Sequence, residues 1–208
     1  TAGETETVSV IYFISDGTDT VPASVQWTVT GTNDAPTVAV TNPPTTPELP
    51  NASAQNIAPV RGILALTDLD VGNTLQVSLV GSPVLALSGG SLTTAQISAL
   101  TTALATGKLS LGSATPSNGG TVNVGYTWDP ASTALDFMAH GQMLTVTYAL
   151  QASDGTATSP TQDLVFTIAG PNAAPGPITF TPAPWTSDTT LPGAGVTIGT
   201  VMAADADG

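Results

Sequence analysis

The amino-acid sequence predicts an all-β protein made of antiparallel β-sandwich repeats in tandem, with one short inserted helix. Two observations lead to this fold class. Short segments of alternating apolar and polar residues recur between Gly, Pro, Asn and Asp turns, which is the pattern of half-buried strands. The chain also repeats itself, and self-similarity at a fixed spacing marks an array of similar units. Many short strands with such punctuation favour a β-sandwich.

The repetition is visible in two pairs of segments. Residues 3–36 (GETETVSVIYFISDGTDTVPASVQWTVTGTNDAP) align with residues 141–175 (GQMLTVTYALQASDGTATSPTQDLVFTIAGPNAAP). Residues 62–70 (GILALTDLD) align in the same way with residues 199–207 (GTVMAADAD). The two pairs are out of phase, so the sequence contains the end of one repeat, one whole repeat and the start of a third.

This phase predicts three parts. Residues 1–34 form the C-terminal part of a preceding repeat, 35–172 a complete central repeat, and 173–208 the N-terminal part of a following repeat. A Pro-rich stretch, TNPPTTPELP, follows Pro36 and is either a linker or a rigid first strand, because prolines stiffen a chain and occur at sheet edges. We expect the chain to be a piece of a long tandem protein.

The expected strands are β-branched and aromatic at every second position, which gives each one buried and one wet face. Asp16-Gly17 and Asp154-Gly155 lie between paired strands and predict hairpin turns. Trp27 and Phe166 hold matching positions in the last strand of the repeat, so both are expected in a core, as are Trp128 and Phe137. The expected strands are 7–14, 24–30, 63–67, 74–80, 122–128, 144–150 and 164–169.

One segment, LTTAQISALTTALATG at 92–107, has the spacing of a helix. Ile97, Leu100 and Leu104 fall on one helical face, and we expect that face to pack on a sheet. Thr93 or Thr94 is suited to cap the start and Gly107 to end the helix. The sequence therefore predicts a helix over about 93–106, with little helix elsewhere.

The composition is strongly acidic, with 15 Asp and Glu residues against two basic residues, and a formal net charge of −13. This charge repels phosphates and anionic membrane surfaces, so nucleic acid and direct membrane insertion are not expected. Excess carboxylate fits divalent cations, above all calcium. There is no cysteine, which excludes disulfides and thiol chemistry, and no apolar run approaches the roughly 18 residues of a membrane span.

Candidate catalytic residues are scarce. His140 is the only histidine, and a Ser/His/Asp triad would need it beside both a serine and a carboxylate. It lies in the sequence AHGQ, which predicts an exposed turn, and one histidine without cysteine is a poor zinc set. Paired carboxylates for glycoside hydrolysis stay open at this stage. The expectation is that this segment is not an enzyme.

Aspartates carry the clearest chemical signal. Asp68-Leu69-Asp70 and Asp205-Ala206-Asp207 each follow an apolar strand, and Asn33-Asp34 lies between two repeats. Calcium takes 6–8 oxygens, so several such segments must converge to hold it. The alternative is that these residues are solvated turn carboxylates, since Asp also favours turns.

The predicted sandwich brings some of these residues to one end. In an Ig-type sandwich the late hairpin and an early inter-strand loop emerge at the same end, and the linker from the preceding repeat arrives there. Asp154, the Asp68/Asp70 pair and the Asn33/Asp34 pair are therefore expected to meet. Asp16 is the equivalent hairpin residue of the preceding repeat.

Three runs together resemble a known family. The runs SDGT to TVTGTNDAP, GILALTDLDVGNTL, and ALDFMAHGQMLTVTYALQASDG resemble the VCBS repeats of large bacterial secreted adhesins of the type I secreted, RTX type. The resemblance covers nearly the whole chain. It implies Ig/cadherin-like sandwiches outside the cell or on the bacterial cell surface, acting as extender or adhesive modules in cell adhesion and biofilm, with Ca²⁺ as the cofactor.

A more distant resemblance to cadherin repeats implies a ligand set for each junction. At the first junction it assigns the linker role, the D-x-D role and the late-hairpin role to Asn33, Asp34, Asp68, Asp70 and Asp154. At the second, weaker junction it assigns Asp136, Asn172, Asp205 and Asp207. Two departures weaken the pattern: Met138 stands where cadherins have a carboxylate, and Ala173 replaces the linker aspartate.

The function expected from the sequence is therefore mechanical. Calcium would stiffen a string of repeats, because carboxylates at a hinge repel one another until a cation bridges them. The expected partners are neighbouring repeats of the same chain, with glycan or host surface ligands bound through other domains. Two alternatives stay open: a surface-layer or filament subunit, and a glycan- or protein-binding accessory module of a secreted multidomain protein.

Overall fold

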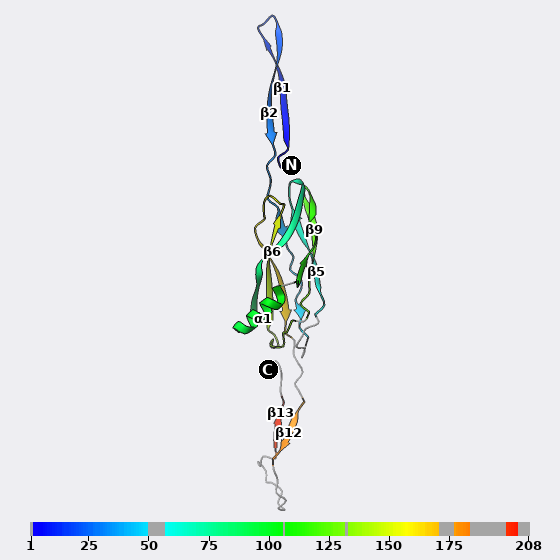
Figure 1. Ribbon diagram of the computed structural model, residues 1–208, viewed down its shortest axis with the longest axis vertical. Coiled ribbons are helices and arrows are strands. Elements are labelled where there is room, and N and C mark those ends of the chain that lie inside the picture. Colours follow the sequence, from blue (N-terminus) through cyan, green and yellow to red (C-terminus); the bar gives the residue numbers. More distant parts are fainter. Residues whose placement is uncertain are drawn as a thin grey trace, which may run out of the picture.

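The computed structural model describes residues 2–49, 57–105, 107–131, 133–170, 177–183 and 199–203. Its described elements form an elongated molecule (Figure 1). A two-stranded hairpin, β1 (Thr5–Ser15) and β2 (Thr20–Thr30), lies at one end. A second short pair, β12 (Thr179–Pro182) and β13 (Gly199–Met202), lies at the other. Between them is a two-sheet sandwich that contains α1 (Thr94–Ala105).

The sandwich has a four-stranded sheet and a five-stranded sheet. In order across the sheet, the four-stranded sheet consists of β3 (Thr37–Ala39), β5 (Val60–Thr67), β9 (Thr121–Trp128) and β7 (Leu109–Leu111). The five-stranded sheet consists of β4 (Thr46–Pro47), β11 (Gln162–Ala169), β10 (Met143–Ser153), β6 (Val71–Ser88) and β8 (Thr115–Asn118).

This strand order is that of an Ig-type sandwich: β3, β5, β9 and β7 correspond to the A-B-E-D sheet, and β6, β10 and β11 correspond to the C-F-G sheet. Neighbouring strands are antiparallel, apart from the short parallel pair of β4 and β11. The Pro-rich stretch contains the two-residue strand β4, which comes after β3, so its middle part forms a strand but not the first strand of the sandwich. The predicted fold class is confirmed.

Alternation of side chains builds the core. Along β10 every second residue from Leu144 to Ala152 is buried, as expected for a strand with one inward face. At the centre, the rings of Trp128 and Phe166 stack with centroids 4.2 Å apart. Tyr126 and Tyr148 each contact Phe166 edge-on at 5.9 Å. Such stacked and edge-on pairs add stabilisation beyond the burial of apolar area.

A buried hydrogen-bond chain ties this core to the helix. Trp128 Nε1 donates to the Tyr148 hydroxyl at 3.1 Å, and that hydroxyl donates to the Leu104 carbonyl at 2.8 Å. Burial raises the pKa of Tyr148 above its ordinary value, because the phenolate would lose its hydration. The chain satisfies three polar groups that would otherwise be buried without partners.

The helix α1 is slightly shorter than the predicted one but has the expected ends. Thr93 Oγ1 accepts from the Gln96 amide at 3.2 Å, and Gln96 Oε1 accepts from the Thr93 amide at 2.8 Å, which is a capping box. Gly107 has a φ of +71°, which suits the residue that ends a helix. Among the described residues, no helix is long and apolar enough to cross a membrane.

One prediction about this helix is corrected. Leu100 and Leu104 are buried, but Ile97 is 44% exposed. Ile97 lies in the first turn of the helix, whereas the two buried leucines lie in later turns. The apolar face that packs is therefore limited to the second half of the helix.

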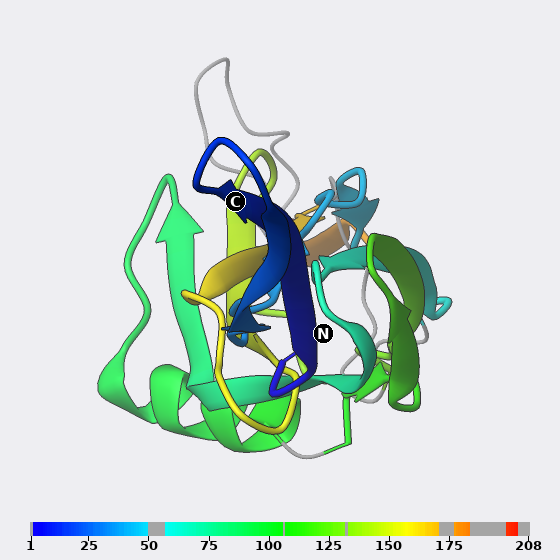
Figure 2. The same cartoon turned by 90° about the horizontal axis from the view of Figure 1, so that it is seen from above.

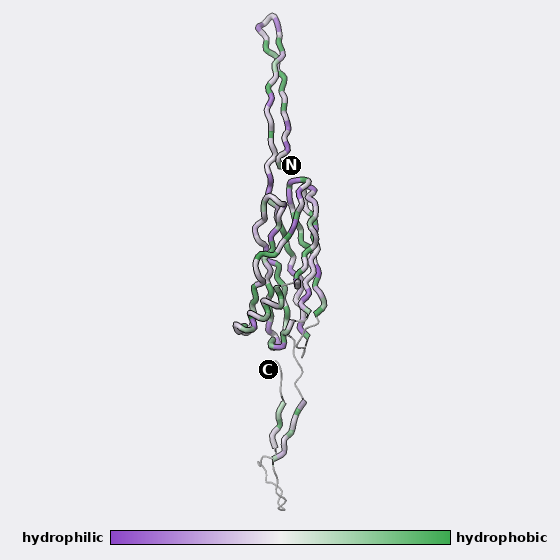
Figure 3. The backbone as a smooth tube through the Cα atoms, in the orientation of Figure 1, coloured by the Kyte–Doolittle hydropathy of each residue, from purple (hydrophilic) through white to green (hydrophobic). Residues whose placement is uncertain are grey.

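The expectation that Trp27 lies in a core is wrong for this structure. Trp27 is 47% exposed, whereas its counterpart Phe166 is 1% exposed. The hairpin β1–β2 projects away from the sandwich (Figure 1), and apolar residues recur along both of its strands (Figure 3). The alternation was assigned correctly, but no second sheet lies against this hairpin among the described residues. Phe137, by contrast, packs partly buried against the core as expected.

We expect Gly62→Val to destabilise the sandwich by about 1–3 kcal/mol, the range for overpacking. A Cβ at Gly62 would overlap the Tyr126 side chain, which lies across the glycine. Gly125→Ala is the matched control, because a Cβ there meets only the Gly62 carbonyl at 3.9 Å. Urea unfolding of both variants measures the difference. Equal midpoints for the two variants would contradict the steric explanation.

Candidate metal site at the linker

Three segments meet at the end of the sandwich that faces the hairpin. β5 ends at Thr67, next to Thr37 and Thr121 in the sheet, and Asp68 follows directly. The turn between β10 and β11 contains Asp154, and the linker that leaves β2 contains Asn33 and Asp34. Figure 2, which looks along the long axis, shows the hairpin projecting over this end of the sandwich. The sandwich topology therefore places these segments together.

Hydrogen bonds join the linker to the sandwich. Asn33 Nδ2 donates to Asp154 Oδ2 at 2.8 Å, and the Asp34 amide donates to Asp70 Oδ2 at 2.8 Å. Asn73 Nδ2 donates to Asn33 Oδ1 at 3.2 Å. The late-hairpin, D-x-D and linker residues predicted from the sequence thus lie in one connected cluster.

Asp68 is the most deeply buried member of the cluster. Its residue is 1% exposed, its Oδ1 accepts from the Asp70 amide at 3.0 Å, and its Oδ2 is buried without a hydrogen-bond partner. Asp70 is 5% exposed and Asp154 is 6% exposed. The alternative of solvated turn carboxylates therefore does not describe these three side chains. A buried carboxylate oxygen without a partner is costly unless a cation or a donor satisfies it.

The backbone around Asp68 is held from the other side by the segment that connects β8 in one sheet to β9 in the other. The Asp68 amide donates to the Gly120 carbonyl at 3.2 Å, and Ser117 Oγ donates to the Asp68 carbonyl at 3.4 Å. Ser117 is itself buried. The position of the unpartnered oxygen is therefore set by two loops rather than by a free chain end.

The two basic side chains of the chain lie at the opposite end of the sheet. Val60 and Leu109 both pair with Trp128, which places Arg61 and Lys108 at that end. Asp68 follows the other end of the same strand, roughly 20 Å away at ~3.3 Å per residue. No side-chain cation of the chain therefore neutralises the cluster.

The Asp154 carboxylate is held in its charged form. Burial alone would raise its pKa, but hydrogen bonds from the Ala157 amide, the Asn33 side chain and the Thr156 amide together lower the pKa below the ordinary value. The hydrogen bonds from the Thr156 and Ala157 amides both go to Asp154 Oδ1 and are 2.6 Å long. Hydrogen bonds to the ionised form stabilise it, so Asp154 is poised as an acceptor at neutral pH.

The donor set fits a hard cation only if amide and backbone oxygens contribute. Among the described residues, no group of three or more His, Cys, Asp or Glu side chains is arranged to hold a metal ion. Calcium also accepts amide and main-chain carbonyl oxygens and water. The Asp68 and Asp70 carboxylates together with Asn33 Oδ1 and Asp154 Oδ2 supply oxygens of the kind that calcium prefers, after exchange of the present hydrogen bonds.

Asn73 was not identified from the sequence. It is half-buried, and it follows Gly72, whose φ of +90° turns the chain back toward the linker. The signal that could have indicated it is the continuation of the D-x-D into D-x-D-x-x-N, over 68–73. Asn side-chain carbonyls are among the oxygens that calcium accepts.

The residues predicted for the second junction are only partly described. Asp136 is exposed in the segment between β9 and β10, at the end of the sandwich away from Asp68. Asn172, Asp205 and Asp207 lie outside the described residues. Met138, which stands in place of a cadherin carboxylate, is 3% exposed and belongs to the core.

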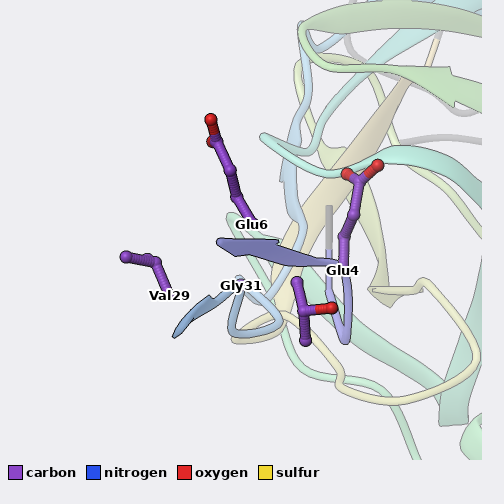
Figure 4. Close-up of a pocket in the computed structure, with 5 residues that line it drawn as sticks. Glu4, Glu6, Val29 and Gly31 are labelled. Carbon is purple, nitrogen blue, oxygen red and sulfur yellow. The ribbon is translucent and has the colours of Figure 1, made fainter. Parts of the chain in front are cut away.

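The remaining candidates for chemistry lie apart from this cluster. His140 is exposed in a turn, as expected. A shallow pocket at the open end of the hairpin is lined by Glu4, Thr5, Glu6, Val29 and Gly31. Figure 4 shows the Glu4 and Glu6 side chains projecting from the same side of β1. His140 does not line this pocket, so the pocket does not contain a Ser/His/Asp-type set.

Comparisons with known proteins show little. No family model and no curated protein matches the chain. An ASH / PapD-like domain of human CEP192 (PapD-like domain 7) is similar at 11% identity and a TM-score of 0.37, over 68% of this chain and 89% of that chain. The zebrafish RET cadherin-like domains 1 to 4 are similar at 13% identity and a TM-score of 0.29, over 82% of this chain and 34% of that chain. The topology described above itself places the sandwich in the Ig-type class.

Two repeat counterparts allow a matched test of the linker contact. Asp16 Oδ1 accepts from the Thr18 and Asp19 amides at 2.9 and 2.8 Å, as Asp154 does from its own turn, but Asp16 is exposed in the hairpin. We expect Asp154→Ala to lower the unfolding free energy of the sandwich by about 1–3 kcal/mol, because it removes three charge-assisted hydrogen bonds from the Thr156 and Ala157 amides and from Asn33 Nδ2. We expect Asp16→Ala to leave it unchanged. Chemical unfolding in chelator measures both, and equal losses would contradict the role of the linker contact.

Proposed function

We propose that this chain is a calcium-binding, Ig-type extender repeat of a long surface or secreted protein of the adhesin kind, with the cation held where the linker meets the sandwich. The single observation that carries the proposal is the buried Asp68 carboxylate, whose Oδ2 has no partner while its neighbours tie the linker to the sandwich. A calcium ion would satisfy that oxygen and the adjacent carboxylates together.

The ligands proposed are the predicted set with Asn73 added. Asp68, Asp70 and Asp154 supply carboxylate oxygens from the sandwich, and Asn33 and Asp34 supply oxygens from the linker. Because the ligands come from both sides, a bound ion would fix the direction in which the preceding element leaves the sandwich. The set at Asp136, Asn172, Asp205 and Asp207 stays a weaker prediction of the same kind.

The present hydrogen bonds modify the mechanical part of the proposal. Asn33 and the Asp34 amide already hold the linker against the Asp154 and Asp70 carboxylates without an ion. The linker is therefore not simply slack in the absence of calcium. The ion would add strength to a preformed contact by replacing weak donors with a divalent charge.

The expected affinity fits a location outside the cell or on a bacterial cell surface. Extracellular calcium modules typically have a Kd of roughly 10⁻⁴–10⁻³ M. At 1 mM calcium such a site adds about 0.4–1.4 kcal/mol, from RT ln(1 + [L]/Kd). Summed over many repeats, this stiffens an array outside the cell and leaves it looser at low cytosolic calcium. The proposal assigns a mechanical and adhesive role and no catalysis.

Calorimetric titration of calcium into chelator-treated protein tests the proposal. We expect one saturable site in the Kd range above, lost in Asp68→Asn and retained in Asp16→Asn, because Asp16 contacts no linker. The Asn33→Ala variant should weaken binding less than Asp68→Asn, since other oxygens remain. A titration without binding heat, or an unchanged isotherm in Asp68→Asn, would overturn the assignment.

A further inference from the structure

The hairpin β1–β2 carries an apolar face that nothing covers among the described residues. Val10, Tyr12, Val25 and Trp27 lie on this face and are 44–47% exposed. An isolated two-stranded hairpin is only marginally stable in water, and a contiguous exposed apolar patch marks an interaction site. The face therefore requires an occupant, and the structure contains a template for it.

The template is the pairing of β10 with β11. In the hairpin, Val8 pairs with Trp27 and Val10 pairs with Val25. In the sandwich, Val146 pairs with Phe166 and Tyr148 pairs with Leu164. These are the residues that correspond in the sequence repeat, so the two hairpins share one register. A shift of one residue would have turned the apolar set to the other face.

The corresponding face of β10 and β11 is fully buried in the sandwich. Val146 and Leu164 are 0% exposed, and Phe166 is 1% exposed. Phe166 stacks on Trp128 of β9, and Tyr126 of the same strand meets it edge-on. For the β10–β11 hairpin, the surface that covers the apolar face is therefore known. It is the inner side of the sheet that contains β5 and β9.

We infer that the apolar face of β1–β2 docks onto an Ig-type sheet of the kind formed by β5 and β9, with Trp27 in the place of Phe166. The shared register favours this occupant over a second copy of the same hairpin. Each apolar pair of β1–β2 would then pack against such a sheet at the same position as the corresponding pair of β10–β11. The candidate cation site lies at the linker that follows the open end of the hairpin, and none of its proposed ligands belongs to the apolar face of β1–β2, so the inference does not depend on the proposed calcium binding.

Three positions in the hairpin predict that the sheet that covers β1–β2 differs in its side chains from the β5–β9 sheet of the sandwich. Val10 stands where Tyr148 reaches the helix carbonyl, and Trp27 is larger than Phe166. Glu6 stands at the position of Leu144, which is 0% exposed. The hairpin thus has less volume at one core position and more at another, and it brings a carboxylate to its open end. Cores respond to such changes of one or two methylene groups, so these residues select the sheet that docks.

Single-cysteine labelling tests the inference, since the chain has no cysteine of its own. Val25→Cys reports on the apolar face, and Gln26→Cys on the opposite face is the matched control. Both are placed in the full chain and in a chain extended by residues 35–140 fused directly before Gly3, the counterpart of Gly141. A second extended chain carries Glu6→Leu and Val10→Tyr as well. Labelling by a maleimide is followed in chelator.

In the unextended chain we expect both cysteines to react at similar rates. In an extended chain we expect Val25→Cys to react at least roughly a hundredfold more slowly, as for a site that reacts only when the sheet opens, with Gln26→Cys unchanged. Protection in the first extended chain supports docking, and protection only in the second supports docking with selection by the two exchanged residues. No protection in either, or protection of the unextended chain together with dimerisation, would overturn the inference.

Discussion

Trp128→Ala is expected to lower the unfolding free energy of the sandwich by about 3–5 kcal/mol, the range for removing a fully buried aromatic side chain. Trp128 is 0% exposed and stacks on Phe166 at 4.2 Å. The substitution also removes the donor to the Tyr148 hydroxyl, which is buried beside the helix. Loss of packing and of a buried hydrogen bond act in the same direction.

The matched control for this prediction is Trp27→Ala. Trp27 is 47% exposed in the hairpin, so its removal leaves no cavity in the sandwich. Urea unfolding followed by circular dichroism measures both variants. A loss below about 1 kcal/mol for Trp128→Ala, outside the range for such residues, would mean that the core is not organised around the ring stack. A large loss for Trp27→Ala would mean that the hairpin is covered in solution.

Calcium is expected to raise the unfolding free energy by about 2.7 kcal/mol at a hundredfold excess over Kd. The ion is expected to bind only the folded form, because its proposed ligands come from the linker, the turn after β5 and the β10–β11 turn and meet only when the sandwich is folded. Thermal unfolding in calcium and in chelator measures the shift. A magnesium series is a control, since magnesium dehydrates reluctantly and prefers strict octahedral geometry.

The effect of Asp68→Asn on the unfolding free energy should have opposite signs in chelator and in calcium. In chelator it removes a buried charge whose Oδ2 has no partner, so the variant is expected to be at least as stable as the parent. In calcium it loses the ion and is expected to be less stable than the parent. Asp16→Asn should follow the parent in both. A variant that is destabilised equally in chelator and in calcium would show that Asp68 acts only through the turn.

Much of the fold could be predicted because short sequence patterns indicate its strands, turns and helix ends. The period-two alternation predicted the inward faces of β5, β9, β10 and β11, and Asp154-Gly155 predicted the turn between the last two strands. Thr93 and Gly107 predicted the helix ends. By contrast, β7, β8 and the second half of β6 were not predicted, because these edge or long segments bury few side chains and owe their pairing to neighbours far away in sequence.

The sequence predicted which residues meet at the site better than it predicted their burial and their hydrogen bonds. The repeat and the sandwich topology brought Asp68, Asp154 and Asn33 together as expected. Asp68 is hydrogen-bonded to Ser117 and Gly120 in the connection between β8 and β9. The Asn33 side chain is hydrogen-bonded to Asp154 and Asn73. These partners are distant in sequence, so no local pattern reports the contacts. The exposure of Trp27 was also not predictable, since its position in the repeat is a core position and only the surroundings differ.

A crystal structure grown in about 10 mM calcium, above the usual Kd of extracellular modules, tests most directly whether a cation lies at the unpartnered oxygen of Asp68. We predict one ion within about 2.3–2.6 Å of Asp68 Oδ2, with further oxygens from the linker. The Asn33 amide should then have turned its oxygen toward the ion. A structure at that calcium concentration with a water or nothing at this oxygen, and with the Asn33–Asp154 hydrogen bond kept, would contradict the account.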